Sequence, residues 1–158
     1  MNIAFFLLPK NEVVYLSPRS TLRQALERME RHRYTAVPLV DEEGHYAGTL
    51  TEGDLLWFLK RTAGVSFDDS EHIRLSQIPQ HMQNEPVSIY ADMKDLIRLA
   101  AVQNFVPVVD DRKLFIGIVR RRDIIEYCAK LLFGQKEETG ATTRPVAADT
   151  PPARASGQ

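Results

Sequence analysis

The sequence predicts an α/β fold made of two pseudo-symmetric β-α-β-β-α repeats that pack sheet to sheet as one module. The main observation is that three anchor residues of the first half recur in the second half at one constant offset of 69 residues. The pairs are Pro38 and Pro107, Gly48 and Gly117, and Asp54 and Asp123. The chain has 158 residues and is 44% hydrophobic, which is enough for a real core. A repeat of about 50 residues buries too little surface to be stable alone, so we expect the two repeats to pack together.

The first repeat is predicted to open with a strand over 13–16 and a turn over 17–20. Thr21 and Gln24 then have the spacing of a capping box, which predicts the start of a helix. Four apolar residues follow at the i, i+3, i+4 and i+7 positions of an amphipathic helix. These residues are Leu22, Ala25, Leu26 and Met29.

Two short apolar runs with β-branched residues, over 36–40 and 46–50, predict the next two strands, with an acidic turn over 41–44 between them. Thr51 is predicted to end the second of these strands and to start a helix over 52–60. This helix carries more apolar surface than one face needs, which predicts a contact between two copies of the chain. The residues concerned are Leu55, Trp57, Phe58 and Leu59.

The second repeat shows the same order of elements with weaker signals. Strands are predicted over 87–89, 106–109 and 114–119, and helices over 92–103 and 123–133. The predicted organisation is an N-terminal arm over 1–11, repeat 1 over 12–60, a connection over 61–86, repeat 2 over 87–133 and a disordered tail over 134–158. The tail contains one Val and no larger apolar residue, so it cannot bury enough surface to offset its ordering entropy.

Charge, cysteine content and hydropathy exclude several classes of protein. Twenty Lys and Arg against 21 Asp and Glu give a net charge of −1, so no overall field attracts nucleic acid or an anionic membrane. Cys128 has no disulfide partner in the chain, which indicates a reducing compartment. The longest apolar run, over 3–8, is far shorter than the roughly 20 residues that cross a bilayer. We therefore expect a soluble, cytoplasmic protein with neither nucleic acid nor a membrane as a partner.

The functional signal lies where the last strand of each repeat meets the following helix. In the first corner, defined as residues 48–54, Gly48, Thr51 and Asp54 have the pattern Gly-x-x-Thr-x-x-Asp. One interpretation is that Thr51 and Asp54 only cap the helix, since an acid there suits the helix dipole. The other is a nucleotide site in a cleft between the repeats, because a helix start binds phosphate and a carboxylate accepts both hydroxyls of a ribose.

The second corner, defined as residues 117–123, keeps the Gly and the Asp but has three consecutive arginines between them. They are Arg120, Arg121 and Arg122. Cations at a helix start oppose the dipole, so the run is unfavourable unless an anion compensates it. We expect at least one of the three to be an ordinary solvated side chain and one or two to reach a phosphate.

The two copies resemble a tandem pair of CBS domains, the module named after cystathionine β-synthase, over roughly residues 12–132. The resemblance rests on Tyr-Thr-Ala-Val-Pro at 34–38, Asn-Phe-Val-Pro at 104–107, the two glycine-containing strands, and Asp54 and Asp123. It implies an adenosine-containing ligand, which in this family is AMP, ADP, ATP, S-adenosylmethionine, NAD or cyclic di-AMP. It also implies that the Thr and the Asp of a corner contact phosphate and ribose, while the apolar strand beside the Pro flanks the base.

Carried over residue by residue, Thr51 and Asp54 match the family pattern in full and are the expected ribose-phosphate pair, whereas the second corner departs at Arg120 and lacks the hydroxyl. Tyr34 is expected either to stack on a base or to pack in the core. The predicted nucleotide-binding residues are Thr51, Asp54, Arg120, Arg121, Arg122, Asp123, Tyr34, Thr35, Ala36, Pro38, Val106 and Pro107.

No catalytic constellation is apparent. The four His residues lack metal-binding spacing, and neither a Gly-x-Ser-x-Gly motif nor a Walker-type loop is present. We therefore predict a non-catalytic regulatory module, with no catalytic or metal-binding residue and no required cofactor. It is expected to bind AMP, ADP or ATP, to form a disc-like homodimer, and to transmit occupancy to a client protein. Two alternatives stay open: a cyclic di-AMP sensor, and a nucleotide-free interaction scaffold in which Thr51 and Asp54 are only caps.

Overall fold

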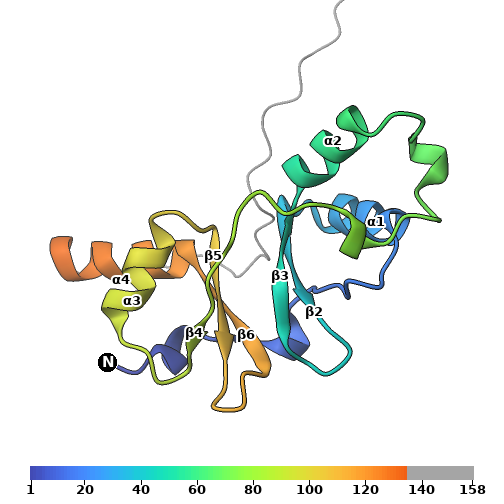
Figure 1. Cartoon of the computed structure of the whole chain (residues 1–158). Coiled ribbons are helices and arrows are strands. Elements are labelled where there is room, and N and C mark those ends of the chain that lie inside the picture. Colours follow the sequence, from blue (N-terminus) through green and yellow to red (C-terminus); the bar gives the residue numbers. More distant parts are fainter. Residues whose placement is uncertain (135–158) are drawn as a thin grey trace, which may run out of the picture.

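A computed structural model describes residues 1–134 of the chain, which form two halves that lie side by side (Figure 1). Each half combines β-strands with two α-helices, so the mixed α/β fold expected from the sequence is confirmed. The predicted disordered tail lies outside the described residues, except for Gly134. Within the described residues, no helix is both long and apolar enough to span a membrane.

The first half contains α1 (Leu22–His32), β2 (Ala36–Val40), β3 (Tyr46–Thr51) and α2 (Glu52–Arg61), and β2 pairs antiparallel with β3. The predicted capping box is confirmed. Thr21 Oγ1 accepts a hydrogen bond from Gln24 N at 3.2 Å, and Gln24 Oε1 accepts one from Thr21 N at 2.9 Å. The apolar stripe of α1 packs into the core of this half, with Leu22, Ala25 and Met29 buried.

The strand predicted over 13–16 is wrong, because only Leu16 pairs there, in a single parallel bridge to Leu39 of β2. Leu16 N donates to Pro38 O at 3.1 Å, and Leu16 O accepts from Val40 N at 2.8 Å. On its other side this extended segment meets a side chain instead of a strand, since Ser17 N donates to Ser20 Oγ at 3.2 Å. One bridge is too little for a strand, so local apolar composition overstated the pairing here.

The second half contains β4 (Val87–Ser88), α3 (Met93–Ala100), β5 (Phe105–Val109), β6 (Phe115–Arg120) and α4 (Arg121–Phe133). The predicted order of elements is confirmed, but α3 is shorter than the helix predicted over 92–103. Asp92 is its N-cap, and the chain turns after Ala100 because Val102 N and Gln103 N both donate to Leu99 O, at 3.0 and 2.8 Å. The sheet has the order β1-β6-β5-β4.

The N-terminal segment belongs to this second sheet. A short 3-10 helix, η1 (Ile3–Phe6), precedes β1 (Leu8–Pro9), and β1 pairs antiparallel with β6. Ile3 has no exposed surface and lies in the core of the second half. The arm expected over 1–11 thus supplies repeat 2 with an edge strand and a core residue.

The connection between the halves runs over the first half before it reaches β4. It contains two 3-10 helices, η3 (Phe67–Asp69) and η4 (Leu75–Gln77). Its apolar residues Ile73, Leu75 and Ile78 are buried in the first core, as the sequence predicts for a connection that is tied down. This attachment fixes the course of the residues that follow Ile78, which pass the first corner.

The two halves meet about a pseudo-twofold axis. His45 forms an antiparallel bridge with Leu114, which is its own counterpart at the offset of 69 residues. The preceding turns match as well, because Asp41 and Asp110 each accept hydrogen bonds from the backbone two and four residues later. A shared apolar cluster joins the sheets and is centred on Val40, Phe105, Phe115 and Ile118. Pairing between counterparts is the geometry of a twofold axis, so the predicted pseudo-symmetric packing is confirmed.

Candidate functional site

Each corner is crossed by a chain segment that precedes the other repeat. Gly48 and Gly117 both have positive φ, at +124° and +156°. A Cβ on Gly48 would overlap the side chain of Gln80, and a Cβ on Gly117 would overlap the backbone of Leu8. Glycine is therefore required at both positions because another segment approaches the strand closely. The crossing segments also determine which groups the two corner carboxylates meet.

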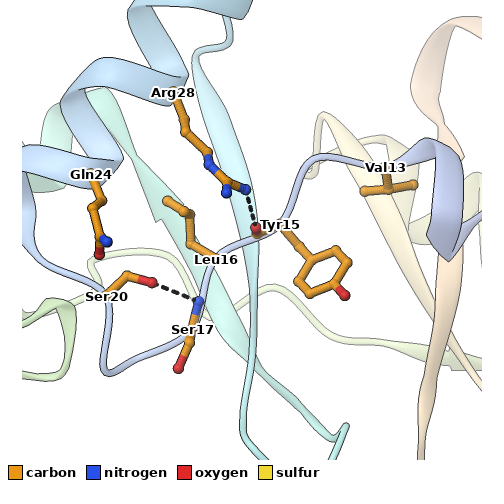
Figure 2. A pocket seen from close by; sticks show the side chains of 7 residues that line it. All are labelled: Val13, Tyr15, Leu16, Ser17, Ser20, Gln24 and Arg28. Atoms are coloured by element: carbon orange, nitrogen blue, oxygen red, sulfur yellow. Dashed lines mark hydrogen bonds between the residues drawn. The ribbon is translucent and has the colours of Figure 1, made fainter.

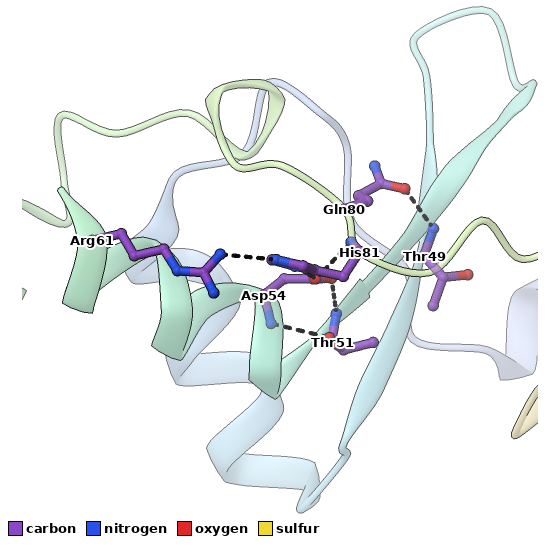
Figure 3. A network of polar contacts seen from close by, with 6 residues as sticks. All are labelled: Thr49, Thr51, Asp54, Arg61, Gln80 and His81. Atoms are coloured by element: carbon purple, nitrogen blue, oxygen red, sulfur yellow. Dashed lines mark hydrogen bonds and ion pairs between the residues drawn. The ribbon is translucent and has the colours of Figure 1, made fainter.

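In the first corner the carboxylate of Asp54 is enclosed, and the residue is only 1% exposed. Its Oδ2 accepts from Thr51 N at 2.9 Å, and Thr51 Oγ1 accepts in return from Asp54 N at 3.1 Å, which completes a capping box. Its Oδ1 accepts from His81 N at 3.0 Å and lies 2.9 Å from His81 Nδ1 (Figure 3). An ionised carboxylate only accepts hydrogen bonds, so Nδ1 carries the proton of this contact.

Further contacts hold the crossing segment on the first corner. Gln80 Oε1 accepts from Thr49 N at 3.2 Å, and Arg61 Nη1 lies 3.5 Å from His81 Nε2 (Figure 3). Burial raises the pKa of Asp54, but hydrogen bonds from His81 and Thr51 outweigh burial and leave this pKa below its ordinary value of 3.8. Asp54 is thus an ionised group whose oxygens are bonded to the chain itself.

The carboxylate of the second corner has different surroundings. Arg120 forms a two-pronged ion pair with Asp123, with Nε 2.8 Å from Oδ2 and Nη2 3.1 Å from Oδ1. The side chain of Asp123 is 22% exposed, whereas that of Asp54 is 1% exposed. The segment that crosses this corner brings Leu8 beside the cavity, and the side chain of Leu8 has no donor to offer. Asp123 is therefore accessible from outside and is paired to a neighbouring cation.

A cavity of about 470 Å³ opens beside Asp123, between the N-terminal segment and α4. Both elements belong to the second half, so this cavity is not the predicted cleft between the repeats. Phe6 and Tyr127 meet edge to face in its wall, with ring centroids 5.2 Å apart. Its lining residues are Phe5, Phe6, Leu7, Leu8, Arg120, Asp123, Glu126, Tyr127 and Lys130. The cavity therefore combines aromatic and apolar surface with two cations and two carboxylates.

The three arginines of the second corner point to three different partners. Arg121 Nε donates to Gln103 O at 2.8 Å, and Arg122 Nε donates to Glu126 Oε1 at 2.6 Å. Of the three, only Arg120 lines the cavity beside Asp123. Arg120 is thus the member of the run that is positioned to reach a ligand there.

The remaining residues of the predicted set serve the fold in this structure. Tyr34 stacks on His32 with ring centroids 5.3 Å apart and packs against the first core. Thr35 O accepts from Glu52 N at 2.9 Å. The other four, which lie in the paired strands β2 and β5, are Ala36, Pro38, Val106 and Pro107. None of the six lines the cavity beside Asp123.

Sequence reasoning missed the crossing segments. Leu7 and Leu8 approach Gly117 as Gln80 approaches Gly48, and Gln80 lies 73 residues after Leu7 in the chain. A signal was available, because an Asn-Glu pair follows both crossing segments at the same distance in sequence. The pair lies at 11–12 after Leu7 and at 84–85 after Gln80. Extending the repeat upstream from that pair would have assigned both crossing segments to their corners. The aromatic wall formed with Tyr127 had no comparable signal.

A separate cavity of about 400 Å³ lies in the first half, between α1 and the extended segment that contains Leu16 (Figure 2). Ser20, Gln24 and Arg28 face it, and Arg28 Nη1 lies 3.5 Å from Tyr15 O. Gln24 and Arg28 are exposed and Ser20 is half-buried, and the side chains of Ser20 and Arg28 are engaged with the backbone of the same segment. This cavity contains no residue of either corner.

One acidic group lies at the junction of the halves. Asp41, Glu43 and His45 are close enough to share an ion. Asp41 Oδ1 accepts hydrogen bonds from Glu43 N and His45 N, at 3.0 and 2.8 Å. Asp110 makes the same bonds in the second half, so these contacts explain the arrangement as a turn.

Comparison with known proteins places the repeats in context. The family model described as "CBS domain" matches residues 7–61 and 75–130. The chain is 29% identical over 122 residues to a CBS domain-containing protein of Dictyostelium discoideum, covering 72% of this chain and 82% of that protein. It is 24% identical over 115 residues to an inosine-5'-monophosphate dehydrogenase of Methanocaldococcus jannaschii, covering 73% of this chain but 21% of the dehydrogenase. The second likeness thus concerns a small part of that enzyme.

Solved structures share the arrangement of the two halves. The CbpB protein of Listeria monocytogenes in complex with c-di-AMP has a TM-score of 0.73 and 19% identity, covering 85% of this chain and 100% of that chain. CBSX2 in complex with AMP has a TM-score of 0.67 and 19% identity, covering 83% of this chain and 98% of that chain. At these identities the likeness concerns the fold.

Proposed function

Because the chain belongs to the CBS domain family, we propose that it is a non-catalytic regulatory module that binds an adenine nucleotide of the AMP, ADP or ATP class. Proteins of similar fold have been solved with AMP and with c-di-AMP, which supports a ligand that contains adenosine. Occupancy would reach a client protein if the nucleotide binds two arrangements of the module with different affinity. A cytoplasmic location is part of this proposal.

The cavity beside Asp123 is the observation that carries the proposal. Its volume of about 470 Å³ suits a small-molecule site. Phe6 and Tyr127 offer aromatic surface to a base, Arg120 and Lys130 offer charge to phosphate, and Asp123 offers acceptors to ribose hydroxyls. The start of α4 adds free backbone N–H groups and the positive end of a helix dipole.

A second nucleotide at the first corner, bound by Thr51 and Asp54, belongs to the proposal with one condition. His81 must first leave the carboxylate of Asp54, because its N and Nδ1 already bond to Oδ1. The segment must also release the bond between Gln80 and Thr49 N. We therefore assign the higher affinity to the second corner, where only the exposed side chain of Arg120 has to move and the crossing segment stays in place.

A cyclic di-AMP sensor is the second candidate, and the solved complex of the Listeria CbpB protein favours it. A ligand with two adenosines suits a homodimer, because two chains bring two copies of each site. Apolar side chains are exposed on both C-terminal helices of the repeats: Leu56 and Trp57 on α2, and Ile125, Leu131, Leu132 and Phe133 on α4. Contact with a second copy would remove this surface from water.

Thermal unfolding with added ligand tests the function. AMP, ADP, ATP, S-adenosylmethionine, NAD and cyclic di-AMP are added in turn, with GMP as a control for the base. A ligand at about 100 times its Kd is expected to stabilise the protein by about 2.7 kcal/mol. The Asp123→Asn variant is expected to lose most of that gain. If none of the adenosine compounds stabilises the protein, the nucleotide-free scaffold is the better account.

A further inference from the structure

The ion pair between Arg120 and Asp123 occupies the acceptors that a ribose would use. One guanidinium takes both carboxylate oxygens, with Nε 2.8 Å from Oδ2 and Nη2 3.1 Å from Oδ1. A ribose diol needs the same two oxygens for its own hydroxyls. An arriving ribose must therefore compete with the guanidinium of Arg120 for the carboxylate of Asp123.

Arg120 is held at this position weakly. It is the N-cap residue of α4, its side chain caps no backbone group, and it is 54% exposed. Its charge lies at the positive end of the helix dipole, which disfavours a cation. Among the described residues, its side chain hydrogen-bonds only to Asp123. An arriving phosphate offers more negative charge and more acceptor oxygens than this exposed ion pair does.

We propose that Arg120 makes ribose binding by Asp123 conditional on phosphate. When a 5′-phosphate takes the guanidinium, both oxygens of Asp123 become free to accept the 2′ and 3′ hydroxyls. A free nucleoside has no group that draws Arg120 away, so it meets a blocked carboxylate. The inference rests on the proposed function and names its ligand class: a nucleoside 5′-phosphate with a free ribose diol, selected against the unphosphorylated nucleoside.

The first corner lacks this device. The residue at the place of Arg120 is Thr51, whose Oγ1 accepts from Asp54 N at 3.1 Å. Asp54 is bonded to backbone N–H groups and to His81. An arriving phosphate therefore finds no arginine on this carboxylate that it could draw away. Selection by exchange of an arginine is therefore specific to the second corner.

Calorimetric titration of AMP and of adenosine tests the exchange in the full chain. The variant is Arg120→Gln, which keeps a polar side chain but removes the charged guanidinium. The matched control is Arg122→Gln, because Arg122 pairs with Glu126. Arg120→Gln is expected to weaken AMP about tenfold, because a charge-assisted bond to phosphate is lost. The same variant is expected to strengthen adenosine about threefold, since an exposed ion pair no longer competes. The control is expected to change neither affinity.

The opposite signs separate exchange from a general structural role, which would weaken both ligands together. If AMP binds the wild-type protein but Arg120→Gln leaves adenosine affinity unchanged or lowers it, the exchange is overturned and the proposed function stands. If the wild-type protein binds neither adenosine nor any of AMP, ADP and ATP, the proposed function and the exchange both fail. The unliganded melting temperature of Arg120→Gln should match that of the control, because both side chains are exposed.

Discussion

The two corners share a backbone and differ in the chemistry that surrounds their carboxylates. Asp54 is buried and bonded to Thr51 and His81, whereas Asp123 is partly exposed, paired with Arg120 and beside a cavity. Part of the difference arises from the crossing segments, which bring a histidine to the first corner and a leucine to the second. The repeated motif therefore determines the position of each carboxylate. The crossing segment helps to determine whether the carboxylate oxygens can accept hydrogen bonds from a ligand.

The largest expected effect concerns the crossing itself. Gly117→Ala would drive a Cβ into the carbonyl oxygen of Leu8, which belongs to a paired strand and cannot move aside. We expect a loss of about 4 kcal/mol in the free energy of unfolding, from steric overlap and positive φ together. Gly48→Ala meets only the end of the Gln80 side chain, so a loss of about 2 kcal/mol is expected.

Denaturant unfolding of both glycine variants measures this difference. The Gly117 variant is also expected to lose AMP binding, because β1 and the cavity wall move together. Equal losses of unfolding free energy would contradict the claim that the backbone of Leu8 cannot move aside while the side chain of Gln80 can.

A smaller effect distinguishes the carboxylates. Asp54→Ala removes an enclosed acceptor and leaves the N–H groups of Thr51 and His81 without their partner, at a cost of about 3 kcal/mol. Asp123→Ala breaks an exposed ion pair, so its cost is expected to be about 0.5 kcal/mol. The free energies of unfolding of the two variants at pH 7 provide the comparison. A similar loss of unfolding free energy for both variants would mean that the burial of Asp54 does not increase its contribution to stability.

The smallest effect is a pH dependence. The pKa of Asp54 lies below 3.8 in the folded protein, so its ionised form contributes stability above the unfolded value, and this contribution is lost as pH falls through the folded pKa. Among residues 1–134, His81 contacts this carboxylate and Arg61 lies behind His81. The stability gap between wild type and Asp54→Asn is therefore expected to narrow below about pH 4. Urea unfolding from pH 7 to pH 3 measures the gap, and a gap that widens towards acid would refute the assigned direction.

Local patterns predicted the parts of the fold that depend on neighbours in sequence. The spacing of Thr21 and Gln24 predicted a capping box that the structure contains, and the constant offset between Gly48 and Gly117 predicted the pseudo-symmetric halves. The prediction of a strand over 13–16 was wrong because a strand needs hydrogen-bond partners along its length, and β2 pairs only with Leu16. Apolar composition alone does not count the available hydrogen-bond partners.

The contact that encloses Asp54 was not predicted because it is long-range, and its one signal was the Asn-Glu pair that recurs upstream. His81 lies 27 residues from Asp54 in the chain, and neither residue carries a local signal for the other. The opposition of charge and helix dipole led us to expect that one or two of the three arginines reach a phosphate, but it did not predict the pairing of Arg120 with Asp123. The buried Ile3 shows a related limit, since an apolar run at a terminus does not reveal which half it joins.

A crystal structure of the protein with AMP is the most direct test of where the nucleotide binds. We predict one nucleotide in the cavity beside Asp123, with its base against the aromatic wall of Phe6 and Tyr127, its phosphate on Arg120, its ribose on Asp123, and His81 still bonded to Asp54. A nucleotide at Asp54 in place of His81, with the cavity beside Asp123 empty, would contradict it.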